Sequence, residues 1–497
     1  MLNEAAIFRG AFWFSIGAFF ERAMFFILPI FIAPLGAASL GIFYLSLRVF
    51  NGIVAFPTNA LNIRYTGKLR KYIQDPKSLK FEETAAFLLK AYFLAGLLLG
   101  TLFLILILIF APFKSFAFLA LAIPFAVANS YMMRLLQLLQ RFKKIFIIQV
   151  IFIFLFQLLY MIIFIGFFKM GIAAAFAGQL LMAILISITA CFLIFDRLNL
   201  LGFFQRLSLK IFTISPLSFT NVLFTTFFPI IDIALVGALF GFSTLGHYIV
   251  LLYLPLLMHK IPTTLFGMFI HVAAVKTRNN EDITQASKQV FKWILLLTMP
   301  LFVAILLFPS DILSVIFHKT YIKDLAIARL LAISYFFQSA SWMAERILIA
   351  KNKKVFRVVS NYIFGSVFVL LSFIFTLAPR SSAEPNEVGF FAFGLFGIAL
   401  AFLIASIFDS LVKYILVVKT TRVSFISTGH LKILAIGALA SFAGYIFFFN
   451  NPLLFFPFSL IIYFAILWML KIVRAKNLYD LRSYISSDPS DEGESRN

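Results

Sequence analysis

Hydrophobic residues run through this chain in long segments that short polar stretches separate. About 20 apolar residues are needed to cross a bilayer core of about 30 Å. Measured against that length, the sequence predicts fourteen transmembrane helices, beginning near residues 11, 40, 84, 115, 145, 171, 213, 244, 290, 326, 357, 389, 431 and 452. The segments between them are too short to fold as separate domains. The predicted fold class is therefore an all-α polytopic membrane protein.

Composition supports this class. The chain has 497 residues, of which 62% are hydrophobic and 12% charged, and its mean hydropathy is +1.02. A soluble domain is about 45–50% apolar and about 25% charged. The single cysteine, Cys191, excludes an internal disulfide and a cysteine-based metal site. The five histidines have no metal-binding spacing, and the sequence has no G-x-x-x-x-G-K phosphate loop. We expect no cofactor, no metal and no enzymatic activity.

The positive charge follows the predicted topology. The net charge is +22, and with the N-terminus in the cytoplasm 30 of the 42 basic residues lie in cytoplasmic segments, against five in outer loops. Cytoplasmic loops carry such an excess, so we expect a protein of the cytoplasmic membrane with both termini inside. The charge is a topology signal, and nucleic-acid binding is not expected.

The two halves of the chain resemble each other. LGAASLGIFY (35–44) aligns without gaps with FGFSTLGHYI (240–249), at an offset of 205 residues that pairs Gly36 with Gly241. Two further matches follow in the same order, KKIF (143–146) with KKVF (353–356) and GIAAAF (171–176) with GIALAF (397–402). Each match falls at the same place in a unit of six helices. An even number of helices per unit gives the two halves the same orientation, as in parallel-repeat transporters.

The repeat predicts two six-helix lobes related by a parallel pseudo-two-fold axis, followed by two additional helices. The predicted divisions are an N-lobe at 1–210, a C-lobe at 211–430, helices 13 and 14 at 431–473 and a partly disordered cytoplasmic tail at 474–497. Substrate sites of repeat transporters lie near the midplane at the interface between the repeats.

Several basic residues lie within the predicted spans, where a charge costs roughly 2.5–3.5 kcal/mol. Arg22 lies midway along helix 1, Arg48 in the outer half of helix 2 and Lys260 midway along helix 8. At about 100° per residue, helix 2 carries one polar stripe, made of Tyr44, Arg48, Asn51, Asn59 and Asn62. These residues predict either a network of helix-packing polar groups or a cationic cavity between the lobes for an anion such as a diphosphate.

Three carboxylates in the spans are candidates for ion coupling or for counter-ions: Glu21, Asp232 and Asp409. Asp409 precedes Lys413 by four residues, the spacing of a pair within one helix, which favours a counter-ion role there. Asp232 has no basic neighbour in sequence and shares a face with Asn221 and Thr225. Further candidates for the cavity are Arg134, Arg346 and His259; for the two arginines, contact with the membrane interface competes with contact to substrate.

These features together resemble a known family. The residues that carry the resemblance are the helix 1 arginine, LGAASLGIFYLSLRVFNGIVAFP into helix 2, MRLLQLLQRFKKIFIIQ between helices 4 and 5, DIALVGALFGFSTLGHYIVL across helices 7 and 8, and FGLFGIALAFLIASIF in helix 12. The chain is similar to the polysaccharide-export, or O-antigen-type oligosaccharide flippase, family of the multidrug/oligosaccharidyl-lipid/polysaccharide exporter superfamily. The resemblance covers nearly the whole sequence.

The resemblance implies two six-helix lobes in a V with alternating access to a central cationic cavity. It also implies that a polyprenyl-(pyro)phosphate-linked oligosaccharide is flipped from the cytoplasmic to the outer leaflet, for polysaccharide or glycoconjugate biosynthesis. In the related lipid II flippases, arginines of helices 1, 2 and 8 serve the cavity, and Arg22, Arg48 and Lys260 match by helix. Helices 13 and 14 would shelter the lipid tail.

The interpretation as a flippase also predicts other partners. We expect membrane lipid, H⁺ or Na⁺ as coupling ion, and a monomer that works with other polysaccharide-assembly proteins. A drug/cation antiporter of the same superfamily is the first alternative, although acids would dominate its cavity and twelve helices are usual there. A membrane glycosyltransferase or polymerase that uses lipid-linked sugars is the second, although the outer loops here are short.

Overall fold

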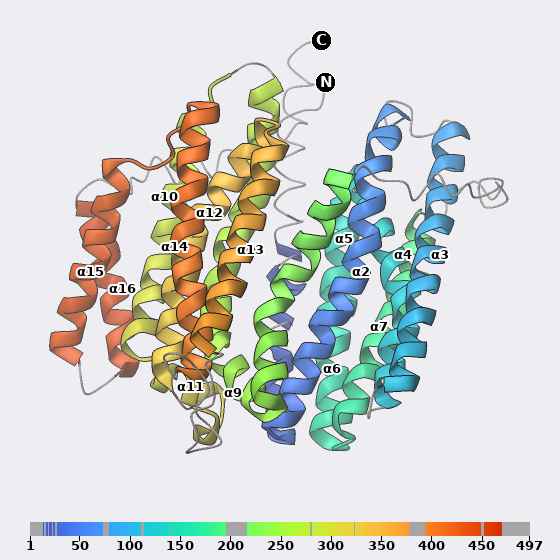
Figure 1. Cartoon of the computed structure of the whole chain (residues 1–497), viewed down its shortest axis with the longest axis horizontal. Helices are drawn as coiled ribbons and strands as arrows, with labels where there is room; N and C mark the ends of the chain where they lie inside the picture. Colours follow the sequence, from blue (N-terminus) through green and yellow to red (C-terminus); the bar gives the residue numbers. More distant parts are fainter. Residues whose placement is uncertain are drawn as a thin grey trace, which may run out of the picture. The chain divides into compact units, whose positions relative to one another are not determined.

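The chain folds into helices throughout the part that the computed structural model describes (Figure 1). That part comprises residues 13, 16–17, 19–21, 23–24, 27–72, 79–110, 114–139, 141–194, 216–278, 281–322, 324–376, 393–448 and 452–469. These residues fall into two compact units, unit 1 up to Ala238 and unit 2 from Leu239 onward. The predicted lobe boundary at residues 210 and 211 lies outside the described residues. Each unit is described by itself.

Unit 1 begins with helix 1, whose described residues between Trp13 and Ile32 are helical, followed by a 3₁₀ turn, η1 (Ala33–Leu35). The next elements correspond to predicted helices 2 to 6: α2 (Ala37–Tyr72), α3 (Leu79–Phe110), η2 (Lys114–Phe116), α4 (Ala117–Leu138), α5 (Phe142–Ile148), η3 (Gln149–Phe156), α6 (Gln157–Met161), η4 (Ile162–Phe167) and α7 (Gly171–Ile194). Predicted helix 5 is divided, because η3 and η4 are π-helical. Such segments are rare, and many lie at functional sites.

Predicted helices 7 and 8 form one long element, α9 (Pro216–Arg278), which is broken at Gly241. The remaining elements belong to unit 2 and match helices 9 to 14: α10 (Thr284–Leu307), α11 (Pro309–Ile316), η7 (Lys319–Tyr321), α12 (Leu325–Ala350), α13 (Lys354–Thr376), α14 (Gly394–Thr421), α15 (Thr428–Phe448) and α16 (Pro452–Met469). A helix is therefore present for each of the fourteen predicted spans.

Nine segments of the described residues are long and apolar enough to cross a membrane. One of them, Phe219–Lys260, contains the break at Gly241 and so holds parts of two predicted helices. Predicted helix 10, which is α12, is long enough but is not among the nine. Its sequence explains this, because Gln338, Ser341 and other polar residues lie along it and are buried inside unit 2.

The core of unit 2 joins helices from its whole length. Buried apolar side chains of α9, α10, α12, α14, α15 and α16 form one cluster, which includes Phe269, Leu295, Met343 and Tyr463. The two additional C-terminal helices thus pack on unit 2 through α10. A Cβ atom at Gly437 of α15 would collide with Met299 of α10, so these two helices approach each other closely.

The paired glycines of the repeat adopt the same backbone conformation. Gly36, just before α2, has φ 104° and ψ 157°, and Gly241, inside α9, has φ 80° and ψ 171°. This region of φ/ψ space is essentially restricted to glycine. Both glycines join two successive helices at the start of their half of the repeat, so the sequence match reflects a shared backbone turn.

We expect Gly241→Ala to lower the thermal stability of the protein, because a side chain in this conformation costs of order 1–3 kcal/mol. Gly36→Ala should act in the same direction. The measurement is the thermal unfolding midpoint of the purified protein in detergent. Gly429→Ala is the control, since a Cβ atom there meets only Ser427 Oγ, at 3.6 Å. Equal midpoints for Gly241→Ala and Gly429→Ala would contradict the assignment.

Candidate functional site

The polar stripe of helix 2 is organised around Arg48. Its Nη2 atom donates a hydrogen bond to Tyr44 Oη at 3.0 Å, and its Cζ atom lies 5.2 Å from the centre of the Tyr44 ring. Tyr44 is one turn away on α2 and only 2% exposed. The phenol therefore orients the guanidinium of a half-buried arginine. Asn51 and Asn59 lie further along α2 and are exposed, and the Asn62 side chain is outside the described residues.

Asp232 of helix 7 belongs to the same part of unit 1. It is buried, at 9% exposure, and its carboxylate interacts electrostatically with Tyr44. The two helices pack closely here, because a Cβ atom at Gly52 of α2 would lie 2.8 Å from Ile230 Cδ1 of α9. Unit 1 thus brings the helix 2 stripe and the helix 7 acid together, although they are far apart in sequence.

Glu21 of helix 1 has a partner that the sequence did not predict. Gln149 Nε2 donates a hydrogen bond to Glu21 Oε2 at 2.8 Å. Gln149 is 3% exposed and is the first residue of the π-helical segment η3. A Cβ atom at Gly17 would collide with Oε1 of the Gln149 side chain, so the glycine leaves room for this side chain in its present position. Arg22, the neighbour of Glu21, lies outside the described residues.

In unit 2, His259 and Lys260 lie side by side on α9 before Pro262. Both are half-buried, and the Lys260 carbonyl accepts a hydrogen bond from Thr263 Oγ1 at 2.8 Å. The His259 ring packs against two rings of α12, with centroid distances of 3.7 Å to Trp342 and 5.2 Å to Tyr335. Aromatic packing thus holds α9 next to the polar helix α12.

Of the two remaining arginines among the predicted residues, Arg134 is exposed on α4 and Arg346 is half-buried on α12. Arg346 lies next to Glu345 in sequence and interacts electrostatically with it. Glu345 Oε1 accepts its hydrogen bond from Arg357 Nε of α13, at 2.7 Å. That ion pair links α12 to α13, and the Arg357 carbonyl accepts a further bond from Ser360 Oγ at 2.9 Å.

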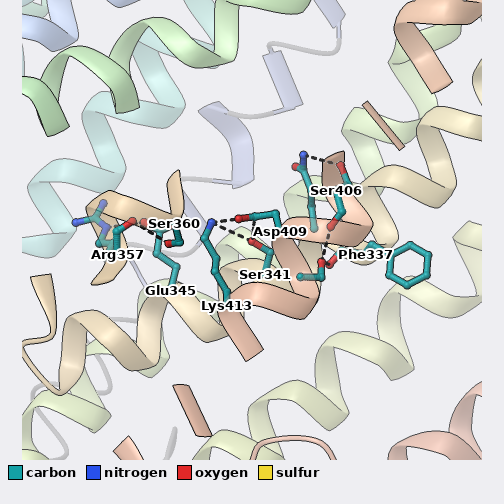
Figure 2. A network of polar contacts seen from close by, with 10 residues as sticks. Phe337, Ser341, Glu345, Arg357, Ser360, Ser406, Asp409 and Lys413 are labelled. Carbon is teal, nitrogen blue, oxygen red and sulfur yellow. Dashed lines mark hydrogen bonds and ion pairs between the residues drawn. The ribbon is translucent and has the colours of Figure 1, made fainter. Parts of the chain in front are cut away.

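Asp409 and Lys413 form the ion pair that their spacing on helix 12 predicts. Lys413 Nζ lies 2.9 Å from Asp409 Oδ2, and both side chains are 3% exposed (Figure 2). Ser341 of α12 completes a triad, because its hydroxyl donates to Asp409 Oδ2 and accepts from Lys413 Nζ at 3.1 Å. The second carboxylate oxygen, Asp409 Oδ1, is buried and has no hydrogen-bond partner among the described residues.

The seam between α12 and α14 continues with neutral polar residues. Gln338 Nε2 donates to Ser406 Oγ at 3.2 Å, and Ser410 Oγ donates to the Phe337 carbonyl at 2.7 Å. Gln338, Ser406 and Ser410 are all buried. Figure 2 shows Ser406 and Phe337 on one side of Asp409 and the Glu345–Arg357 pair on the other.

Sequence reasoning missed Gln149, Ser341 and the Glu345–Arg357 pair. A partial signal was present on helix 10, where Ser341 and Glu345 are four residues apart and so share a face, as Asp409 and Lys413 do on helix 12. No such spacing links Gln149 to Glu21, which are 128 residues apart.

No protein-family model and no curated protein matches the sequence. Solved structures do match the fold. The lipid II flippase MurJ, in an inward closed conformation, matches with a TM-score of 0.72 at 15% identity, over 93% of this chain and 99% of that chain. A multidrug resistance MATE family transporter of the MOP superfamily, in an inward-facing conformation, matches with a TM-score of 0.61 at 13% identity, over 81% of this chain and 96% of that chain.

A MOP superfamily transporter from Pyrococcus furiosus matches with a TM-score of 0.60 at 14% identity, over 85% of this chain and 100% of that chain. The MATE and MurJ neighbours have a two-lobe fold of 12 to 14 helices. The predicted fold class, an all-helical membrane protein with two lobes, is thereby confirmed. The neighbours are transporters and flippases of the MOP superfamily, not enzymes. The predicted site residues stay predictions.

We expect Lys413→Met to destabilise the protein by about 3–5 kcal/mol, because the buried Asp409 carboxyl group loses its cation, and both an unpaired buried charge and proton uptake at neutral pH cost free energy. The double variant Asp409→Asn/Lys413→Met should recover most of that loss, since a neutral pair of similar size needs no counter-ion. Thermal unfolding midpoints of the wild type, both single variants and the double variant form the cycle that measures the coupling. Additive effects of the two substitutions would contradict a coupled pair.

Proposed function

We propose that this protein flips a polyprenyl-(pyro)phosphate-linked oligosaccharide from the cytoplasmic to the outer leaflet of the cytoplasmic membrane by alternating access. The proposal rests on one observation, which is the share of this chain that each of the two kinds of structural neighbour covers. The MurJ flippase matches 93% of the chain, whereas the MATE and Pyrococcus furiosus transporters match 81% and 85% although their own chains are almost wholly covered. MurJ thus matches more of this chain than the other two do.

A fold that lacks the two C-terminal helices would leave the last part of this chain unmatched. With the predicted tail, α15 and α16 occupy the last part of the chain after α14, outside the two six-helix repeats. In the proposed function these helices shelter the prenyl chain of the substrate. A twelve-helix drug antiporter needs no such addition, so the length of the fold favours a lipid-linked substrate.

The proposed ligand groups for the phosphates are Arg22, Arg48 and Lys260, with Asn51 and Asn59 as neutral donors to the sugar. An arginine presents a planar fork that suits phosphate, and a lysine supplies a compact point charge. Tyr44 supports the role of Arg48, because it holds the guanidinium in one orientation before any ligand binds. Preorganisation of this kind lowers the entropic cost of binding.

Arg48→Ala and Lys260→Ala are expected to reduce export of the lipid-linked sugar by roughly 10- to 100-fold each. This range corresponds to the loss of a charged hydrogen bond worth about 1.5–3 kcal/mol. The assay is complementation of a flippase-deficient strain, with expression measured in parallel, and Arg22→Ala is a third test variant. Two exposed cations serve as matched controls, Lys143→Ala in unit 1 and Lys419→Ala in unit 2. Normal export by all three test variants would contradict the proposed cationic site.

A binding experiment separates this function from drug export. We expect a polyprenyl monophosphate to raise the thermal unfolding midpoint of the protein in nanodiscs. At a lipid concentration of 100 times the Kd, binding should stabilise the folded protein by about 2.7 kcal/mol. The same polyprenol without phosphate should have a much smaller effect, and so should Arg48→Ala with the full lipid. Tetraphenylphosphonium is the comparison ligand. Stabilisation by this cation and not by the lipid phosphate would favour the antiporter instead.

A further inference from the structure

The Ser341–Asp409–Lys413 triad has a neutral counterpart in the other half of the repeat. Asn129 lies five residues before Arg134 on helix 4, as Ser341 lies five residues before Arg346 on helix 10. Asn129 accepts a hydrogen bond from Ser187 Oγ of α7 at 2.7 Å and donates one to the Ala183 carbonyl at 2.8 Å. Helices 4 and 6 of unit 1 are therefore joined by an amide and a hydroxyl, where helices 10 and 12 of unit 2 use a carboxylate and an ammonium group.

This difference argues that the charges have a task beyond packing. The neutral contact shows that the repeat can join these helices without ionised groups. A charge inside the membrane is expensive and marks a functional position by default, and a buried ion pair adds little net stability over a neutral one. A purely structural role therefore leaves the Asp409 and Lys413 charges unexplained.

The surroundings of Asp409 contain both groups that favour its carboxylate and groups that favour its neutral acid. Lys413 on its own helix favours the carboxylate, and Ser341 donates to it from α12. Burial and the negative charge of Glu345, also on α12, favour the neutral acid. Since Oδ1 has no hydrogen-bond partner among the described residues, a proton can be added there without breaking a bond already made.

Lys413 has a second carboxylate within electrostatic range. It interacts with Glu345 as well as with Asp409. Ser341 and Glu345 are one turn apart on α12, opposite Asp409 and Lys413, which are one turn apart on α14. In the structure Lys413 is bonded to Asp409 and Ser341. Glu345 is already bonded to Arg357 of α13 and interacts with Arg346, so a state in which Lys413 turns to Glu345 is a minor one at rest.

We propose that Asp409 is a proton-exchange site whose occupancy is set by the position of Lys413. When Lys413 turns from Asp409 to Glu345, the buried carboxylate loses its cation and takes a proton from water on Oδ1. When Lys413 returns, the proton leaves to water and the ion pair re-forms. Proton binding is thereby linked to the contact between α12 and α14. Proton exchange at Asp409 does not depend on the proposed transport function. The inference rests on that function only for the process that proton binding would drive.

The test uses infrared difference spectroscopy of the full-length protein in nanodiscs, which detects the C=O stretch of a protonated buried carboxylic acid. In the wild type we expect this band to appear on acidification, and to be absent in Asp409→Asn. In Lys413→Met the band should be present already at neutral pH, and it should disappear in Asp409→Asn/Lys413→Met. Asp311→Asn, which alters an exposed acid of α11, is the matched control and should keep the wild-type response.

Two results would overturn the proposal: an acid-induced band that survives in Asp409→Asn, or a Lys413→Met protein with no protonated acid at neutral pH. If Lys413→Met does not fold, the comparison of the wild type, Asp409→Asn and Asp311→Asn still decides whether Asp409 binds the proton. The experiment needs no substrate, so a negative result here leaves the flippase function standing, and failure of the export assay leaves the proton site standing.

Discussion

Hydrocarbon offers no hydrogen bonds, so every polar group within a membrane span needs a partner from the protein. The helices satisfy the backbone, and the arrangement of this chain then depends on how its few polar side chains are paired. Glu21 is bonded to Gln149, Glu345 to Arg357 and Asp409 to Lys413. Each of these contacts gives a carboxylate of the helices a hydrogen-bonding partner, and Asp409 is the most deeply buried of the three. The Glu21 and Glu345 contacts also join two helices, and Ser341 joins the Asp409 pair to α12.

The repeat shows which of these contacts are required by the architecture. Its glycine turns recur with the same conformation at Gly36 and Gly241, because two helices must be joined by the same short connection in each half. The contact between helices 4 and 6 recurs between helices 10 and 12, but its chemistry changes from neutral to charged. The architecture therefore explains why these helices are in contact in both halves. It does not explain why the contact in unit 2 is charged, so we attribute that charge to function.

Much of the fold could be predicted from the sequence, because the length of each apolar segment depends only on consecutive residues. The fourteen helices, the paired glycines and the Asp409–Lys413 pair all depend on residues within one helix or on an ungapped alignment. Ser341 could not be predicted as the third member of the triad, since its contact depends on how α12 packs against α14. The π-helical segments η3, which begins at Gln149, and η4 could not be predicted either, because their sequences are as apolar as the ordinary helices around them.

The attachment of helices 13 and 14 follows from the same constraint. Apolar helices gain little from the hydrophobic effect when lipid already surrounds them, so close packing and specific polar contacts must hold them together. Gly437 gives close packing against Met299. At the start of α15, His430 Nε2 donates to the Lys288 carbonyl of α10 at 3.0 Å, and Nδ1 accepts from the Ser427 amide at 2.9 Å. A loosely attached pair of helices would need neither contact. The pair is therefore packed into the core of unit 2, as the proposed shelter for a lipid chain would have to be.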